Sequence, residues 1–206
     1  MTPKSKKQFE EMRQQSIAAI KQAALELFAH RGYASTSISQ IAREAGISKG
    51  LMYNYFSSKE DLLRAIILDA VETGEKLVEG SLHESPEPHT QIQGIVESVF
   101  RAVKENGHYW KLLTSLAFQP GAFEGLEEIM NLKREANLAM GKALLSRLGA
   151  DEPELEAYLF GAALDGMMMH YFFLEDEYPF DAMQAHIIER FTPRPDQQRP
   201  PKERSS

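Results

Sequence analysis

The chain has 206 residues, of which 43% are hydrophobic, and a net charge of −7, so its length fits one large or two small domains. It contains no cysteine, which excludes disulfides, zinc sites built on cysteine and cysteine nucleophiles. No apolar run approaches the ~20 residues that span a bilayer, and the charged N-terminus lacks the apolar core of a signal peptide; we therefore expect a cytoplasmic protein without a membrane partner.

The first expected elements are a charged arm over residues 1–14 and a helix that ends at Gly32. Glycine is the usual residue directly after a helix. Apolar residues follow the 3.6-residue helical period in this segment, at Ile17, Ile20, Ala24, Leu27 and Phe28.

Two short helices are predicted next, separated by a turn at Gly46. Ser37 and Gln40 fit a capping box for the first, whose apolar face consists of Ile38, Ile41, Ala42 and Ala45. Ser48 is placed to cap the second, a helix of about two turns with Met52 and Phe56 pointing inward.

The remainder is also predicted to be helical. Ser57 and Glu60 fit a capping box that opens a helix running past Leu77. A break follows over residues 85–90, where two prolines lie. Further helices are expected from Ile92 to about Val103, near residues 109–118, and over 126–148, 153–174 and 181–191, with Asp181 capping the last. The tail 192–206 is rich in proline and polar residues, which predicts disorder. The fold class is therefore all-α.

Charge is distributed unevenly along the chain. Residues 1–66 hold ten basic and six acidic residues, a net charge of +4, which leaves −11 for the rest. A cationic N-terminal segment can approach phosphates although the whole chain is acidic.

Several motifs in order resemble the DNA-binding domain of the TetR family of transcriptional regulators. They are ALELF with the following GY, IAREAGISKG, YNYF, and the Lys59–Leu62 start of the next helix, and together they cover residues 15–66. The resemblance implies an N-terminal three-helix domain with a helix-turn-helix, followed by a helical effector-binding and dimerisation domain over 67–191.

In a helix-turn-helix, the N-terminal residues of the second helix face the base edges. Lys49 can reach guanine or a phosphate, Leu51 can meet a thymine methyl, and Asn54 can read adenine or contact the backbone. The resemblance and this chemistry together predict DNA contacts at Thr36, Ser37, Ser48, Lys49, Gly50, Leu51, Tyr53, Asn54, Tyr55 and Lys59. The alternative is that Thr36, Ser37 and Ser48 serve as helix caps and that Tyr55 mainly packs.

The segment 153–174 is apolar on more than one side, which indicates burial on more than one side. The family commonly dimerises through its last two helices, so the resemblance predicts a homodimer. The residues assigned to this interface are Ala157, Gly161, Ala162, Asp165, Gly166, Met169, Ile187 and Phe191. Ordinary packing within one chain is the alternative.

Aromatic and thioether side chains in the central segment suit an apolar ligand pocket. The predicted lining residues are Trp110, Phe118, Met130, Met140, Met167 and Met168, with core packing as the alternative. His186 and Glu189 lie three residues apart but lack a third ligand, so neither a metal nor a cofactor is predicted.

The predicted function is a homodimeric repressor that binds a palindromic DNA operator and is released by a hydrophobic small molecule. A constitutive or activating DNA-binding regulator is the first alternative. An all-helical carrier or enzyme is the second; the sequence has none of the common nucleotide-binding, hydrolase or zinc-protease motifs, so no enzymatic activity is expected.

Overall fold

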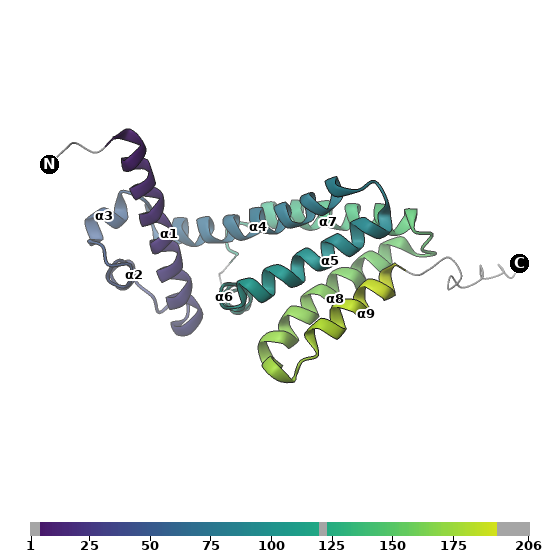
Figure 1. Cartoon of the computed structure of the whole chain (residues 1–206). Helices are drawn as coiled ribbons and strands as arrows, with labels where there is room; N and C mark the ends of the chain where they lie inside the picture. Colours follow the sequence, from purple (N-terminus) through teal and green to yellow (C-terminus); the bar gives the residue numbers. More distant parts are fainter. Residues whose placement is uncertain (1–4, 120–122, 193–206) are drawn as a thin grey trace, which may run out of the picture. The chain divides into compact units, whose positions relative to one another are not determined.

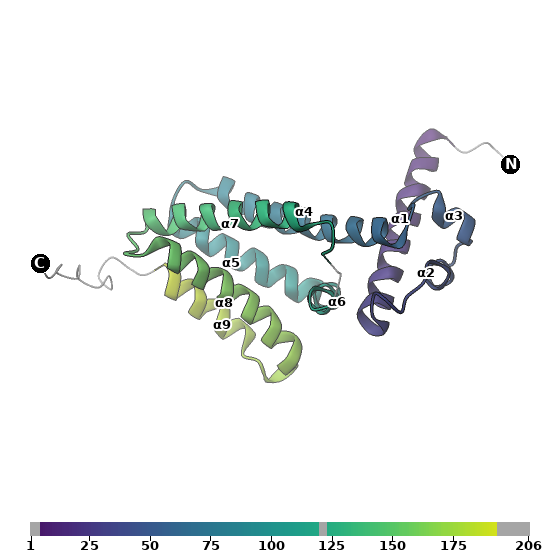
Figure 2. The same cartoon turned by 180° about the vertical axis from the view of Figure 1, so that it is seen from behind.

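The computed structural model describes residues 5–119 and 123–192, and these residues form helices and no strand, so the predicted all-α fold is confirmed. No helix among them is long and apolar enough to cross a membrane. In chain order (Figures 1 and 2), the elements are α1 (Lys6–Arg31), α2 (Ile38–Glu44), α3 (Lys49–Tyr53), α4 (Lys59–Glu84), α5 (Pro88–Glu105), α6 (Gly107–Ala117), α7 (Glu127–Arg147), α8 (Pro153–Leu174), the 3₁₀ turn η1 (Glu175–Glu177) and α9 (Phe180–Phe191).

The chain divides into two compact units. The N-terminal unit consists of Met1–Thr73 and His108–Ile129, and the C-terminal unit of Gly74–Gly107 and Met130–Ser206. The N-terminal unit therefore holds α6 as well as the segment that resembles a DNA-binding domain. Sequence patterning did not indicate this attachment of residues 108–129.

The core of the N-terminal unit forms where α1 packs against α2 and α2 against α3. Met52 and Phe56 are 0% and 6% exposed, which confirms their predicted inward orientation. They share this core with apolar residues of α1, α2 and α4, namely Ile20, Ala24, Phe28, Ile41, Ala42, Leu62, Leu63 and Ile66.

Helix starts follow the predicted caps at Ser37 and Ser48 and depart from the other predicted caps. The Ser37–Gln40 capping box is present, with Ser37 Oγ accepting from the Gln40 N–H. The predicted Ser57–Glu60 box is wrong by one residue: Ser58 Oγ accepts from the Asp61 N–H, and Asp61 Oδ2 accepts from the Ser57 N–H. This shift puts the helix start one residue later and leaves Lys59 in its first turn.

Three other parts of the chain also correct the sequence interpretation. Helix α1 begins at Lys6 behind a Ser5–Gln8 capping box, so most of the predicted arm is helical. Pro88 is the first residue of α5, a position where its missing N–H costs nothing. Asp181 does not cap α9; its carboxylate accepts from Lys104 Nζ at 3.2 Å instead. The predicted disorder of the tail concerns residues that, except for Thr192, lie outside the described ones.

Helix α6 and the short segment after it are hydrogen-bonded to the rest of the N-terminal unit. At its start, His108 Nε2 lies 2.6 Å from Glu26 Oε1 on α1, and this contact lowers the pKa of the Glu26 carboxyl. After its end, Gln119 hydrogen-bonds to the backbone at the end of α1. Arg64 of α4 donates to the Gly125 carbonyl at 3.2 Å.

In the C-terminal unit, α9 packs against both α5 and α8, and Figure 2 shows α8 alongside α9. Phe160 of α8 meets Phe191 of α9 with ring centroids 4.9 Å apart. Helix α7 approaches α8 closely at Gly141, where an added Cβ would lie 3.2 Å from that of Ala157. The small residue at position 157 therefore serves packing within one chain.

Candidate nucleic-acid interface

Helices α2 and α3 are joined by a tight turn centred on Gly46. Gly46 has a φ of 68°, a left-handed conformation that side chains other than glycine rarely adopt. Its N–H donates to the Arg43 carbonyl, and the Ile47 N–H donates to the Ala42 carbonyl, so the turn satisfies two carbonyls at the end of α2. Ser48 then caps α3 through the Leu51 N–H at 3.1 Å. The result is the helix-turn-helix arrangement that the sequence predicts.

The first residues of α3 are presented to solvent. Met52 anchors the helix in the core, while Leu51 is 37% and Tyr53 50% exposed. Lys49 and Gly50 are exposed as well. An added Cβ at Gly50 would meet no atom within 4 Å, so the fold itself does not require glycine there. The absent side chain instead leaves room for an outside partner to approach the backbone.

The flanking predicted residues occupy different environments. Ser37 and Ser48 cap helices and remain exposed, so the capping role does not block an outside contact. Asn54 is exposed just after the end of α3, and Tyr55 is half-buried. These four residues lie at or next to the ends of α2 and α3.

Thr36 departs from the prediction. Thr36 is 2% exposed, and its hydroxyl donates to the Gly32 carbonyl at 2.9 Å. A side chain with so little exposure cannot reach a phosphate in this conformation, so the assignment of Thr36 as a side-chain DNA contact is contradicted. Its hydroxyl satisfies the end of α1 instead.

Lys59 also makes hydrogen bonds within the fold. Its Nζ donates to the Tyr33 carbonyl at 2.9 Å and to the Thr36 carbonyl at 3.0 Å, and it lies 4.3 Å from the centre of the Tyr33 ring. The Tyr33 hydroxyl donates to Glu60, and burial together with this bond raises the pKa of Tyr33 to about 12. Lys59 therefore holds the loop between α1 and α2, with one ammonium proton left for a phosphate.

Replacing Lys59 by Met should consequently lower protein stability even without DNA. The apolar part of the side chain is kept, while two charge-assisted hydrogen bonds to loop carbonyls are lost, at a cost of about 1–3 kcal/mol. Chemical denaturation of the free protein measures this loss. Lys142→Met is the control, because its surface pair with Glu154 should contribute little. Equal stability of the two variants would show that Lys59 does not hold the loop.

Comparison with known proteins identifies the segment around this turn. Residues 20–66 match the family described as bacterial regulatory proteins, tetR family. This N-terminal segment is therefore a TetR-family DNA-binding domain. The regulator HbdR of Aromatoleum sp. (strain CIB), described as an HTH-type transcriptional regulator, is 42% identical over 78 residues, which are 36% of this chain and 32% of HbdR. This chain thus covers only about a third of HbdR, and that match supports the N-terminal domain.

Two longer similarities extend into the C-terminal unit. The HTH-type transcriptional regulator BetI of Rhizobium meliloti (strain 1021) is 28% identical over 152 residues, 72% of this chain and 74% of BetI. The crystal structure of the transcriptional regulator FadR from Bacillus subtilis in complex with stearoyl-CoA superposes with a TM-score of 0.69 at 19% identity. The superposition covers 85% of this chain and 97% of FadR, and shows that the two share a fold.

The residues predicted to form a dimer interface separate into two groups in the structure. Ala157, Ile187 and Phe191 are 8%, 4% and 3% exposed, so their burial within one chain contradicts a surface role. Gly161, Ala162 and Asp165 are exposed, and Gly166 and Met169 are partly so. Desolvation raises the pKa of the Asp165 carboxyl.

The sequence interpretation missed the large side chains that share this exposed face of α8. Leu155, Leu159 and Phe173 are 60%, 47% and 78% exposed, and Tyr158 is 54% exposed. At 3.6 residues per turn they align with Ala162, Gly166 and Met169 on one side of the helix. The spacing of three to four residues was visible in the sequence from Leu155 onward and could have located this face.

The residues predicted to line a ligand pocket are not gathered into one site. Trp110 and Phe118 belong to the N-terminal unit, and Met130, Met140, Met167 and Met168 to the C-terminal unit. Phe118 is 71% exposed and Met167 is 2% exposed. Met130, Met140 and Met168 are partly exposed.

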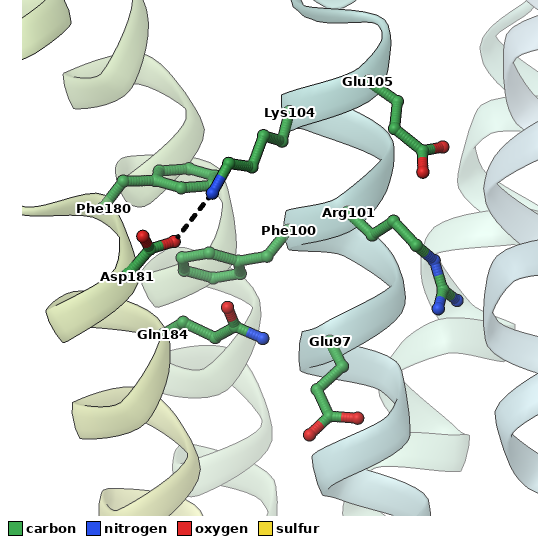
Figure 3. A pocket seen from close by; sticks show the side chains of 8 residues that line it. All are labelled: Glu97, Phe100, Arg101, Lys104, Glu105, Phe180, Asp181 and Gln184. Carbon is green, nitrogen blue, oxygen red and sulfur yellow. Dashed lines mark hydrogen bonds and ion pairs between the residues drawn. The ribbon is translucent and has the colours of Figure 1, made fainter.

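A cavity of about 200 Å³ lies elsewhere, between α5 and α9. Figure 3 shows Phe100 and Phe180 between these helices, with Lys104 bound to Asp181 beside them. Charged and polar side chains dominate the rest of its lining, namely Glu97, Arg101, Glu105 and Gln184. None of the predicted pocket residues lines this cavity.

Proposed function

We propose that this protein is a transcriptional regulator that binds a specific DNA operator through α3. The observation that carries the proposal is the exposed N-terminal face of α3, set by the Gly46 turn within a segment that matches the TetR family. The major groove admits a helix whose first residues face the bases. The net charge of +4 over residues 1–66 favours approach to phosphates.

The proposed contacts to bases are made by Lys49, Gly50, Leu51 and Asn54. Tyr53, Tyr55 and the exposed caps Ser37 and Ser48 contact phosphates, because hydroxyl donors and helix N-termini commonly hold the DNA backbone. The remaining proton of Lys59 adds a phosphate contact to its structural role.

A homodimer fits this function. A recognition helix of five residues reads only a few base pairs, so two copies on a palindrome supply the specificity. The exposed apolar face of α8 supports a second copy as its partner, since contiguous apolar patches on soluble proteins usually mark interaction sites. An added Cβ at Gly161 or Gly166 would meet no atom within 4 Å, which leaves space for close approach of another helix.

The proposed effector is a hydrophobic small molecule that releases the operator, so that the protein acts as a repressor. The FadR structure of the same fold was determined with stearoyl-CoA, which makes a long-chain acyl thioester the first compound to test. The partly exposed Met130, Met140 and Met168 of the C-terminal unit are the proposed contacts to the acyl chain, because flexible thioethers adapt to varied shapes. Release requires the effector to bind the DNA-free conformation more tightly than the DNA-bound one.

Selection of bound sequences from random DNA tests the proposal directly. Purified protein should enrich a palindrome whose half-sites are about one helical turn apart, or a multiple of it. The enriched DNA then serves in a release assay with stearoyl-CoA against free coenzyme A. Failure to enrich any sequence would refute the regulator, while enrichment without release by the thioester would refute this effector alone.

A further inference from the structure

Gln119 joins the end of α6 to the end of α1. Its side-chain Nε2 donates to the Phe28 carbonyl at 2.7 Å, and its Oε1 accepts from the Tyr33 N–H at 2.7 Å. Phe28 lies in the last turn of α1, and Tyr33 is the second residue after that helix. One amide group therefore bridges the last turn of α1 and the loop that leads to α2.

The loop held by Gln119 leads directly to the helix-turn-helix. The carbonyls of Tyr33 and Thr36 accept hydrogen bonds from Lys59, and Ser37 caps α2. Only three residues separate Tyr33 from this cap. A displacement of Tyr33 therefore acts on the start of α2, which packs against α3.

The segment that carries Gln119 is an excursion of the chain from one compact unit into the other. Residues 108–129 belong to the N-terminal unit, yet the residues before and after them belong to the C-terminal unit. Helix α6 is thus covalently tied at both ends to the C-terminal unit and hydrogen-bonded to the N-terminal one.

Three hydrogen-bonded attachments among the described residues can be compared, and they differ in what they hold. The His108–Glu26 contact joins α6 to the middle of α1, and the Arg64–Gly125 contact joins α4 to the segment after α6. Both are exposed, whereas both Gln119 bonds are part-buried. Of these three, the Gln119 attachment alone reaches the loop before α2.

We propose that Gln119 is a positioning residue through which α6 sets the α1–α2 loop and, through that loop, the placement of α2 and α3 on DNA. This inference rests on the proposed regulator function and assigns part of its regulation to one side chain. Loss of the bridge lowers operator affinity by more than the accompanying decrease in fold stability would cause.

The matched control is Gln91, which makes an equivalent bridge in the C-terminal unit. Its Nε2 donates to the Leu82 carbonyl at 2.9 Å, and its Oε1 accepts from Arg147 at 3.0 Å. Gln119→Leu and Gln91→Leu each remove two side-chain hydrogen bonds at similar volume. Both variants should show a similar decrease in melting temperature.

Operator affinity, measured on DNA selected with the wild-type protein, separates the two. Gln119→Leu should weaken binding about tenfold, while Gln91→Leu stays within about twofold of wild type. Hydrogen exchange of the Tyr33 amide should accelerate in Gln119→Leu only. If Gln119→Leu binds like Gln91→Leu, or if Tyr33 exchange is unchanged, the positioning role is overturned. A wild-type protein that selects no operator overturns the regulator function and this role together.

Discussion

Replacing Leu159 with Glu should convert the protein to a monomer and reduce operator affinity by about 100-fold or more. Leu159 is 47% exposed on the apolar face of α8, in line with Leu155 and Ala162. In a twofold symmetric interface each substitution appears twice, so two carboxylates would be brought together and desolvated. A monomer engages one half-site and loses the gain from simultaneous binding of two.

Leu132→Glu provides the matched control for this prediction. Leu132 is 59% exposed on a different helix, α7, and the change introduces the same charge. Sedimentation of the three proteins at micromolar concentration gives the oligomeric state, and titration of operator DNA gives the affinity. A Leu159→Glu protein that sediments like wild type would exclude this face as the dimer interface.

The α8 face also shows where sequence patterning succeeds and where it fails. The bounds Pro153–Leu174 follow from the first-turn proline and the apolar run, and the structure has the same bounds. A helix that is apolar all round does not reveal which side its own chain covers. The sequence interpretation places Ala157 on the outward side, but Ala157 packs closely against Gly141 of α7. Which side of α8 is buried depends on where α7 packs, and the local sequence of α8 does not encode the position of α7.

Polar residues near α3 also differ in whether their partners are close in the sequence or far from them in it. The Ser37–Gln40 box joins residues three apart, so its geometry follows from helix formation itself. Gln119 and Tyr33 lie 86 residues apart in the chain, and Lys59 reaches carbonyls 23 and 26 residues away. Long polar side chains take their partners from tertiary structure, so the role of Lys59 as a loop anchor could not be predicted from its motif.

This result changes how the DNA contacts should be tested. A Lys59 variant mixes loss of a phosphate contact with loss of loop stability. Lys49 and Tyr53 avoid this problem, because both are exposed and, within the part of the chain that the structure describes, neither side chain has a recorded hydrogen bond or ion pair. Their removal should leave the melting temperature of the free protein unchanged.

The double variant Lys49→Ala, Tyr53→Ala should lose about 100-fold in operator affinity, since each contact contributes about 1–3 kcal/mol. Loss of the lysine charge should also decrease the dependence of log affinity on log salt by about one unit if Lys49 meets a phosphate. An unchanged salt slope with a changed base preference would place it on guanine instead. Leu51→Ala should weaken operator binding while sparing nonspecific DNA, because a methyl contact reads sequence and carries no charge. Wild-type affinity in the double variant, with the fold intact by thermal denaturation, would remove α3 as the recognition helix.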